Sequence, residues 1–72
     1  MNYIDDGVKI DFPVTKDIQY LMEECEKADR EDNYPIYENY VNVLVFVVSK
    51  EAYVQGHLTK KQWETIERRY QL

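Results

Sequence analysis

Apolar positions recur with a helical period after residue 14. Their spacing of three and four residues places them on one side of a helix that we predict over residues 15–31. This stripe consists of Ile18, Leu21, Met22, Cys25 and Ala28. Thr15 suits the N-cap of the helix, and Pro35 disfavours a helical conformation for the residue before it. The pattern therefore predicts a first helix with one buried side.

Residues 40–48 form the only long apolar block of the chain. Such a block suits either a buried strand or a helix that is buried on most sides. Five of its residues are valines, which favours a strand over residues 41–48. The flanking polar residues, however, continue a helical period, Pro35 suits a first helical turn, and Gly56 suits the left-handed position after a helix. We therefore favour a second helix over residues 35–55 and keep the strand as the alternative.

Two apolar stripes run along this second predicted helix. The first stripe consists of Tyr37, Tyr40, Val41, Leu44, Val48 and Ala52. The second stripe consists of Val43, Phe46, Val47 and Val54. A single core needs only one stripe, and an exposed apolar patch generally marks an association site. The second stripe therefore predicts self-association through Val43, Phe46 and Val47, which would give a homodimer.

The clearest local motif begins at Thr59. Thr59 and Gln62 have the spacing of a capping box, in which each side chain bonds to the backbone of the other residue. Trp63, Ile66 and Tyr70 then recur with a helical period. The pattern predicts a third helix over residues 59–71, joined to the second helix by the turn at Gly56.

The first 13 residues carry a weaker β pattern. Residues 8–12 alternate between apolar and polar side chains, and the pair Asp6 and Gly7 is typical of a hairpin turn. We predict a β-hairpin or an extended arm over residues 1–13, attached to a mainly α domain of three helices that spans residues 1–72. If residues 41–48 form a strand, the alternative is an α+β domain of ββαβα order.

Composition narrows the class of protein. A single cysteine excludes an internal disulfide and is typical of a reducing compartment. The apolar block is about half the length of a membrane span, and the N-terminus lacks the order of a signal peptide. We expect a cytoplasmic protein with no membrane contact.

The charge is unevenly distributed along the chain. The net charge of −5 divides into −7 over residues 1–38 (11 acids, 4 bases) and +2 over residues 39–72 (3 acids, 5 bases).

Catalytic and metal-binding patterns are weak. His57 follows a turn glycine without an evident orienting partner, and Cys25 lies on the apolar stripe of the first helix. The two residues do not make a zinc site without further ligands, and no glycine-rich phosphate loop is present. We therefore expect a non-catalytic protein with no metal and no cofactor.

A protein-interaction or regulatory module is the function that the composition favours. Tyrosines and clustered carboxylates are typical of binding surfaces and of long-range steering. The predicted protein-binding residues are Glu23, Glu24, Glu26, Asp29, Glu31, Asp32, Tyr34 and Tyr37. A sharper hypothesis is an inhibitor from a phage or a mobile element, whose acidic side chains block a basic nucleic-acid-binding protein.

DNA binding is the alternative function. The spacing of Ala52 and Gly56 resembles the turn of helix-turn-helix proteins. The cations that would meet phosphates are Lys60, Lys61, Arg68 and Arg69. Contact with phosphates supplies most non-specific affinity for DNA, and the chain as a whole is acidic. Nucleic acid is therefore the less favoured partner.

Overall fold

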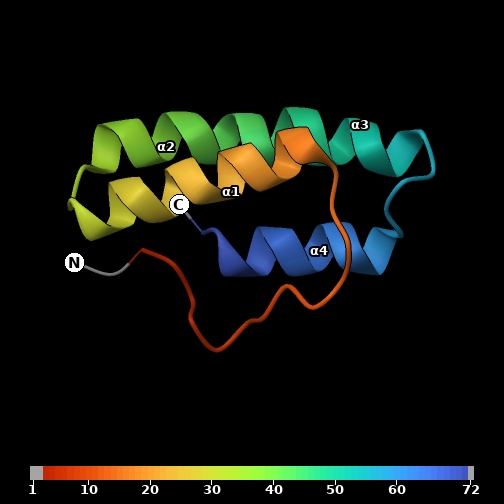
Figure 1. Cartoon of the computed structure of the whole chain (residues 1–72), viewed down its shortest axis with the longest axis horizontal. Helices are drawn as coiled ribbons and strands as arrows, with labels where there is room; N and C mark the ends of the chain where they lie inside the picture. Colours follow the sequence, from red (N-terminus) through yellow and green to blue (C-terminus); the bar gives the residue numbers. More distant parts are fainter. Residues whose placement is uncertain (1–2, 72) are drawn as a thin grey trace.

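A computed structural model describes residues 3–71 of the chain. The helical elements follow one another in the order α1 (Lys16–Arg30), α2 (Tyr34–Val43), the π-helical turn η1 (Leu44–Val48), α3 (Ser49–Val54) and α4 (Lys60–Arg69). Figure 1 shows that α2, η1 and α3 form one continuous rod, which we call the long helix (residues 34–54). The chain is therefore mainly helical, with three helical rods and no strand in its described part.

The helices begin at polar side chains that accept hydrogen bonds from the first turn. The hydroxyl of Thr15 accepts from Ile18 N–H, and the side chain of Asn33 accepts from Ile36 N–H. At α4 the capping box is complete, because the Thr59 hydroxyl accepts from the backbone of Gln62 and the Gln62 side chain accepts from the backbone of Thr59. The contacts of Thr15 and Thr59 confirm the caps predicted there.

Two helices end in the same left-handed motif. After α3, Gly56 has a φ of 84°, and His57 N–H donates to the carbonyl of Ala52. After α1, Asp32 has a φ of 53°, and Asn33 N–H donates to the carbonyl of Ala28. Both patterns match a Schellman motif, in which a backbone N–H reaches back across the last turn. The sequence predicts the left-handed conformation at Gly56. It does not predict the same conformation at Asp32, because residues with a side chain disfavour a positive φ.

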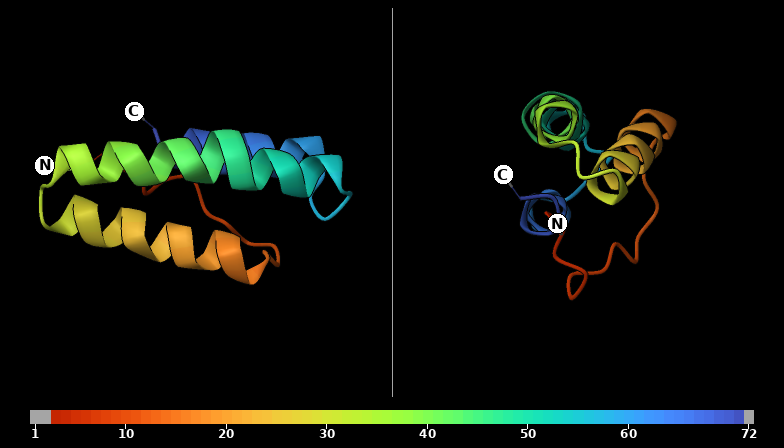
Figure 2. Two further views of the ribbon diagram at one scale, coloured as in Figure 1. Left: turned by 90° about the horizontal axis from the view of Figure 1, so that it is seen from above. Right: turned by 90° about the vertical axis from the view of Figure 1, so that its left-hand side faces the viewer.

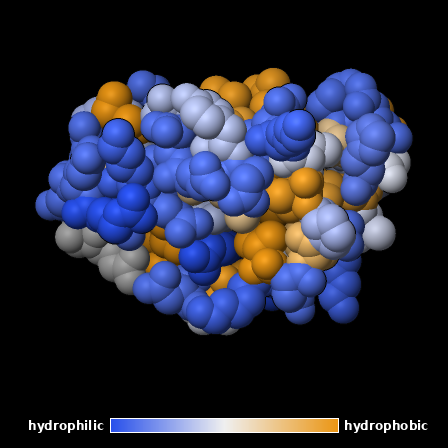
Figure 3. Space-filling view, viewed as in Figure 1, coloured by the Kyte–Doolittle hydropathy of each residue, from blue (hydrophilic) through white to orange (hydrophobic). Residues whose placement is uncertain are grey.

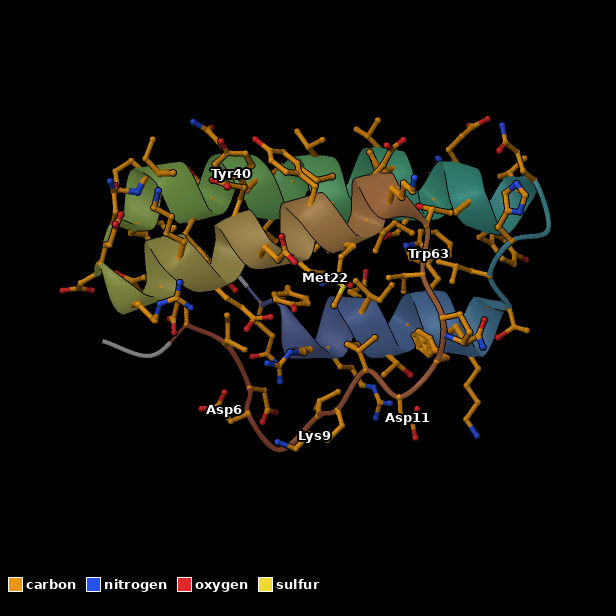
Figure 4. The ribbon with its side chains drawn as sticks, viewed as in Figure 1. Asp6, Lys9, Asp11, Met22, Tyr40 and Trp63 are labelled. Carbon is orange, nitrogen blue, oxygen red and sulfur yellow. The ribbon has the colours of Figure 1, made fainter. Side chains whose placement is uncertain are left out.

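The three rods pack as an up-down-up bundle. Figure 1 and the end view in Figure 2 show α1 running antiparallel to the long helix, and α4 returning beside both. The core contains the whole predicted stripe of α1, together with residues of the long helix and α4. Met22 points from α1 toward α4 in Figure 4. Each helix thus buries one face against the other two.

The π turn changes the face that the long helix buries. Ser49 N–H donates to the carbonyl of Leu44, five residues back, instead of the residue four back. Trp63, which lies between α4 and the long helix in Figure 4, donates its indole N–H to the carbonyl of Val45 at 2.9 Å. Leu44 and Val45, the first two residues of this turn, are both fully buried. The alternative ββαβα fold was wrong, since residues 41–48 are helical throughout.

Residues 3–15 form an arm that crosses the bundle between α1 and α4 (Figure 2). The chain turns at Asp6 and Gly7, where Val8 N–H donates to the carbonyl of Asp5 at 3.1 Å. No strand ladder follows it within the described residues, and Ile4 instead makes an isolated antiparallel bridge with Tyr70. The beginning of the arm is therefore attached to the end of α4.

Candidate functional site

The exposed apolar side chains gather on the long helix. Eight large apolar or aromatic residues are exposed among those described, and all except Tyr20 lie between residues 34 and 54. We call the five aliphatic and phenylalanine side chains of this set the outer face. Their exposed fractions are Ile36 42%, Val43 42%, Phe46 52%, Val47 59% and Val54 67%. Figure 3 shows apolar surface along the edge of the molecule where α2 and η1 lie.

The period of the long helix explains why these residues share a side. Ile36 and Val43 are seven residues apart, which is two α-helical turns. Val43 and Val47 are separated by about one turn of the wider π helix, and Val54 follows Val47 by another seven residues. The opposite side of the same rod carries the core residues Tyr37, Val41, Leu44, Val45 and Ala52.

Shallow hollows adjoin the outer face on two sides. One hollow of about 240 Å³ lies against α4 and is lined by Phe46, Val41, Val45, Glu67, Tyr70 and Gln71. Another, of about 290 Å³, lies near the start of α1 and is lined by Val47, Val48, Ala52, Thr15, Asp17, Glu51, Gln55 and His57. Phe46 thus lines one hollow, and the neighbouring Val47 lines the other.

Four of the predicted acidic binding residues make contacts within the chain; Glu23 accepts a local hydrogen bond from the Gln19 side chain at 3.0 Å, and the other three contact the ends of the described chain. Asp29 accepts a hydrogen bond from the backbone N–H of Tyr3, and Asp32 accepts one from the Tyr3 hydroxyl at 2.6 Å. Glu26 accepts from the Tyr70 hydroxyl at 2.8 Å and lies 3.8 Å from the Arg69 guanidinium. These three carboxylates therefore hold the arm and the end of α4 in place.

The hydrogen bond between Tyr3 and Asp32 changes the acidity of both groups. It raises the pKa of the Tyr3 phenol to about 12, and it holds the pKa of the Asp32 carboxyl below its usual range. The Tyr3 ring also contacts the rings of Tyr34 and Tyr37, with centroids 5.2 Å and 5.0 Å away. Much of the predicted binding surface thus serves to dock the arm.

The other predicted protein-binding residues differ in how much of their surface is exposed. Glu23 and Glu31 are exposed, Glu24 is half-buried, and Tyr34 is exposed on the first turn of α2. Tyr37 is fully buried, and its hydroxyl donates to the carbonyl of Gln71 at 2.8 Å. Its assignment to a protein-binding surface is corrected, because its place on the apolar stripe with Val41 and Leu44 turns it into the core.

Only some cations of the DNA-binding alternative share a surface: Lys61 and Arg68 line one hollow, together with the acidic residues Glu64 and Glu67. Lys60 and Lys61 are exposed at the start of α4. Arg68 lies near the other end and donates to the Thr65 hydroxyl at 3.4 Å. Arg69 is half-buried and donates to the carbonyl of Val8 at 2.8 Å. Arg69 is therefore part of the attachment of the arm.

The two residues considered for catalysis lie in different environments. Cys25 is fully buried, and burial raises the pKa of its thiol to about 12. His57 is exposed and lines the hollow beside Val47, to which Cys25 does not contribute. Within residues 3–71, no group of three or more His, Cys, Asp or Glu side chains gathers in a way that could hold a metal ion.

The sequence pattern identified most of the outer face. Val43, Phe46 and Val47, predicted for self-association, are all exposed there, and Val54 belongs to the same predicted stripe. Ile36 was missed, although its distance of seven residues from Val43 is a signal for a shared side. The face is thus longer than predicted and extends over almost the whole rod.

Comparison of the chain with protein-family models, curated proteins and solved structures finds no match. Over the part of the chain that the structure describes, no helix has both the length and the apolar character needed to cross a membrane.

Proposed function

We propose that the chain is a non-catalytic protein-binding module that uses the outer face of the long helix as its contact surface. One observation carries this proposal: seven of the eight exposed large apolar or aromatic residues in the described chain lie on a single rod. Side chains of this type are expected inside, and a contiguous exposed group of them generally marks an interface.

The energetics favour a partner at this surface. Removing apolar area from water contributes about 25 cal/mol per Å², so several half-exposed aliphatic side chains on one rod give a useful driving force for association. The residues of the face lie on a helix, and their positions are fixed before binding. A rigid surface loses little conformational entropy when a partner covers it.

The inhibitor form of the proposal has less support than the apolar contact. Glu26, Asp29 and Asp32 bind the arm and the end of α4, so a basic target would meet mainly Glu24, Glu31 and Glu23, which also accepts a hydrogen bond from Gln19. Charge in the first half of the chain would then steer a partner rather than provide the main contact. We also propose a cytoplasmic location, because a chain with a single cysteine is typical of a reducing compartment.

A photo-crosslinking amino acid tests the proposed surface. We would introduce it in place of Val47 on the outer face and, as a matched control, in place of Glu64, an exposed residue of α4. Irradiation of cells that produce each variant should give a discrete adduct for the Val47 position, either with a second copy or with another protein. The Glu64 position should give none.

Circular dichroism would first establish that both variants are helical. Adducts of equal yield at the two positions, or none at Val47 in a folded variant, would contradict the proposal.

A further inference from the structure

We propose that the partner of the outer face is a second copy of the chain. The two long helices are antiparallel, and the twofold axis that relates them crosses the outer face at the height of residue 45 along the helix. This inference rests on the proposed function and specifies its partner. It follows from the positions of four outer-face residues, which lie at equal distances from the middle of the long helix.

Four of the five outer-face residues are placed symmetrically about position 45; the fifth, Phe46, has the fully buried Leu44 as its counterpart. Val43 and Val47 lie two residues on either side of it, and Ile36 and Val54 lie nine residues on either side. In an antiparallel pair with a central twofold axis, residues at equal distances from the axis meet across the interface. Val43 then packs against the partner's Val47, and Ile36 lies opposite the partner's Val54.

One pair of polar residues, Asn39 and Glu51, obeys the same symmetry, although Glu51 also accepts a hydrogen bond from the Gln55 side chain at 3.0 Å. Asn39 and Glu51 are each six residues from position 45 and are both exposed. Each would meet the other across the axis, so that a polar group faces a polar group. An interface in which these positions met valine or isoleucine would instead bury unpaired polar atoms at a cost.

Opposite charges provide the second argument. Glu38 precedes position 45 by seven residues, and Lys50 follows it by five. Both are exposed, and neither has an ion-pair partner among the described residues. The offset of two residues corresponds to about 3 Å along a helix, which long side chains span. Antiparallel pairing therefore brings Glu38 of each copy near the partner's Lys50, and the twofold axis makes two such pairs.

One side of the long helix is not covered by α1 or α4. The end view in Figure 2 shows α1 and α4 together on one side of the long helix, and the opposite side is uncovered. A rod of 21 residues is about 31 Å long, so a single pair of helices gives an interface near the small end of specific contacts. We expect a reversible dimer with a dissociation constant on the order of micromolar.

Reversing the charges of Glu38 and Lys50, singly and together, tests the antiparallel dimer. Glu38→Lys and Lys50→Glu are each expected to weaken the dimer by about tenfold, because two attractive pairs become repulsive. An equimolar mixture of the two variants should associate as tightly as the original chain. In the mixed dimer, the lysine introduced at position 38 of one copy faces the glutamate introduced at position 50 of the other, and the unchanged Glu38 and Lys50 form the second pair.

The double variant, with both substitutions in one chain, should also recover the original affinity, since each pair is then reversed but still attractive. Sedimentation equilibrium from low to high micromolar concentration measures the two single variants, their mixture and the double variant at moderate ionic strength. Lys61→Glu on α4 serves as the charge control and should leave the dissociation constant unchanged.

The outcomes separate the two proposals. A monomer over the whole range would overturn the inference of a second copy, whereas an adduct of the Val47 crosslinker with another protein would leave the proposed function intact. A dimer that is weakened by Val47→Lys but is unaffected by both charge reversals would overturn the antiparallel arrangement.

Discussion

At the scale of single residues, Ser49 is the exception in an otherwise apolar core. It is fully buried, and its hydroxyl oxygen has no hydrogen-bond partner among the described residues. A buried hydroxyl without a partner loses its hydrogen bonds to water and gains nothing in return. We expect Ser49→Ala to raise the free energy of unfolding by about 1 kcal/mol, measured by urea denaturation.

Ala52 provides the matched control on the same rod. It is also buried, three residues further along α3, with an exposed fraction of 5%. Ala52→Ser introduces the hydroxyl that Ser49→Ala removes, so the free energy of unfolding should fall by a similar amount, about 1 kcal/mol. A loss of stability in Ser49→Ala would mean that the hydroxyl has a partner, such as an ordered water molecule, in solution.

At the scale of elements, the π turn and α4 depend on each other. In an α-helix, Ser49 N–H would donate to the carbonyl of Val45, but here that carbonyl accepts the indole N–H of Trp63. Trp63→Phe keeps an aromatic ring and removes the donor. We expect the free energy of unfolding to fall by about 1–2 kcal/mol, measured from the thermal or urea transition in circular dichroism.

Tyr53→Phe is the control for this contact. The Tyr53 ring stacks on Trp63 with centroids 5.3 Å apart, and phenylalanine retains the stacked ring. Its effect should stay within about 0.5 kcal/mol. If Trp63→Phe also changed the free energy of unfolding by less than about 0.5 kcal/mol, the hydrogen bond from Trp63 to the Val45 carbonyl would not be a main contribution to the packing of α4 on the π turn.

The same elements show what the sequence could predict. Helix caps at Thr15, Asn33 and Thr59 are local, because the donor and acceptor lie within three residues of each other. The π turn is not local, since it depends on Trp63, which lies 18 residues beyond Val45. A regular helical period therefore predicted Val43 and Phe46 on the outside correctly but did not identify Val45 and Ser49 as buried.

The contacts of the acidic residues within the chain were not predicted, for a related reason. Glu26, Asp29 and Asp32 have the sequence pattern of a solvated or binding surface on a helix. Their partners come from the two ends of the chain, Tyr3 at one end and Tyr70 at the other. Contacts between residues so distant in the sequence have no signal in local spacing, and only the folded chain brings them together.

At the scale of the whole molecule, the arm completes a small core. A chain of this size buries only about 60% of the surface of its unfolded state, so each added contact matters. Ile4 is buried to an exposed fraction of 6%, and the neighbouring Asp5 N–H donates to the carbonyl of Arg69 at 2.9 Å. The first residues of the described chain thus cover α1 and α4 at the same time.

Ile4→Ala tests whether the arm is part of the cooperative fold. Truncation of a buried isoleucine removes apolar contacts and leaves a cavity, so the free energy of unfolding should fall by about 2–4 kcal/mol. Lys9→Ala, an exposed position on the same arm, should change it by less than about 0.5 kcal/mol. Both values come from urea denaturation followed by Trp63 fluorescence and by circular dichroism. If the arm belongs to the core, both probes report one unfolding transition, and its midpoint falls to the same extent for both probes in Ile4→Ala. A small change in the midpoint would mean that the three helices are stable without the contacts of the arm.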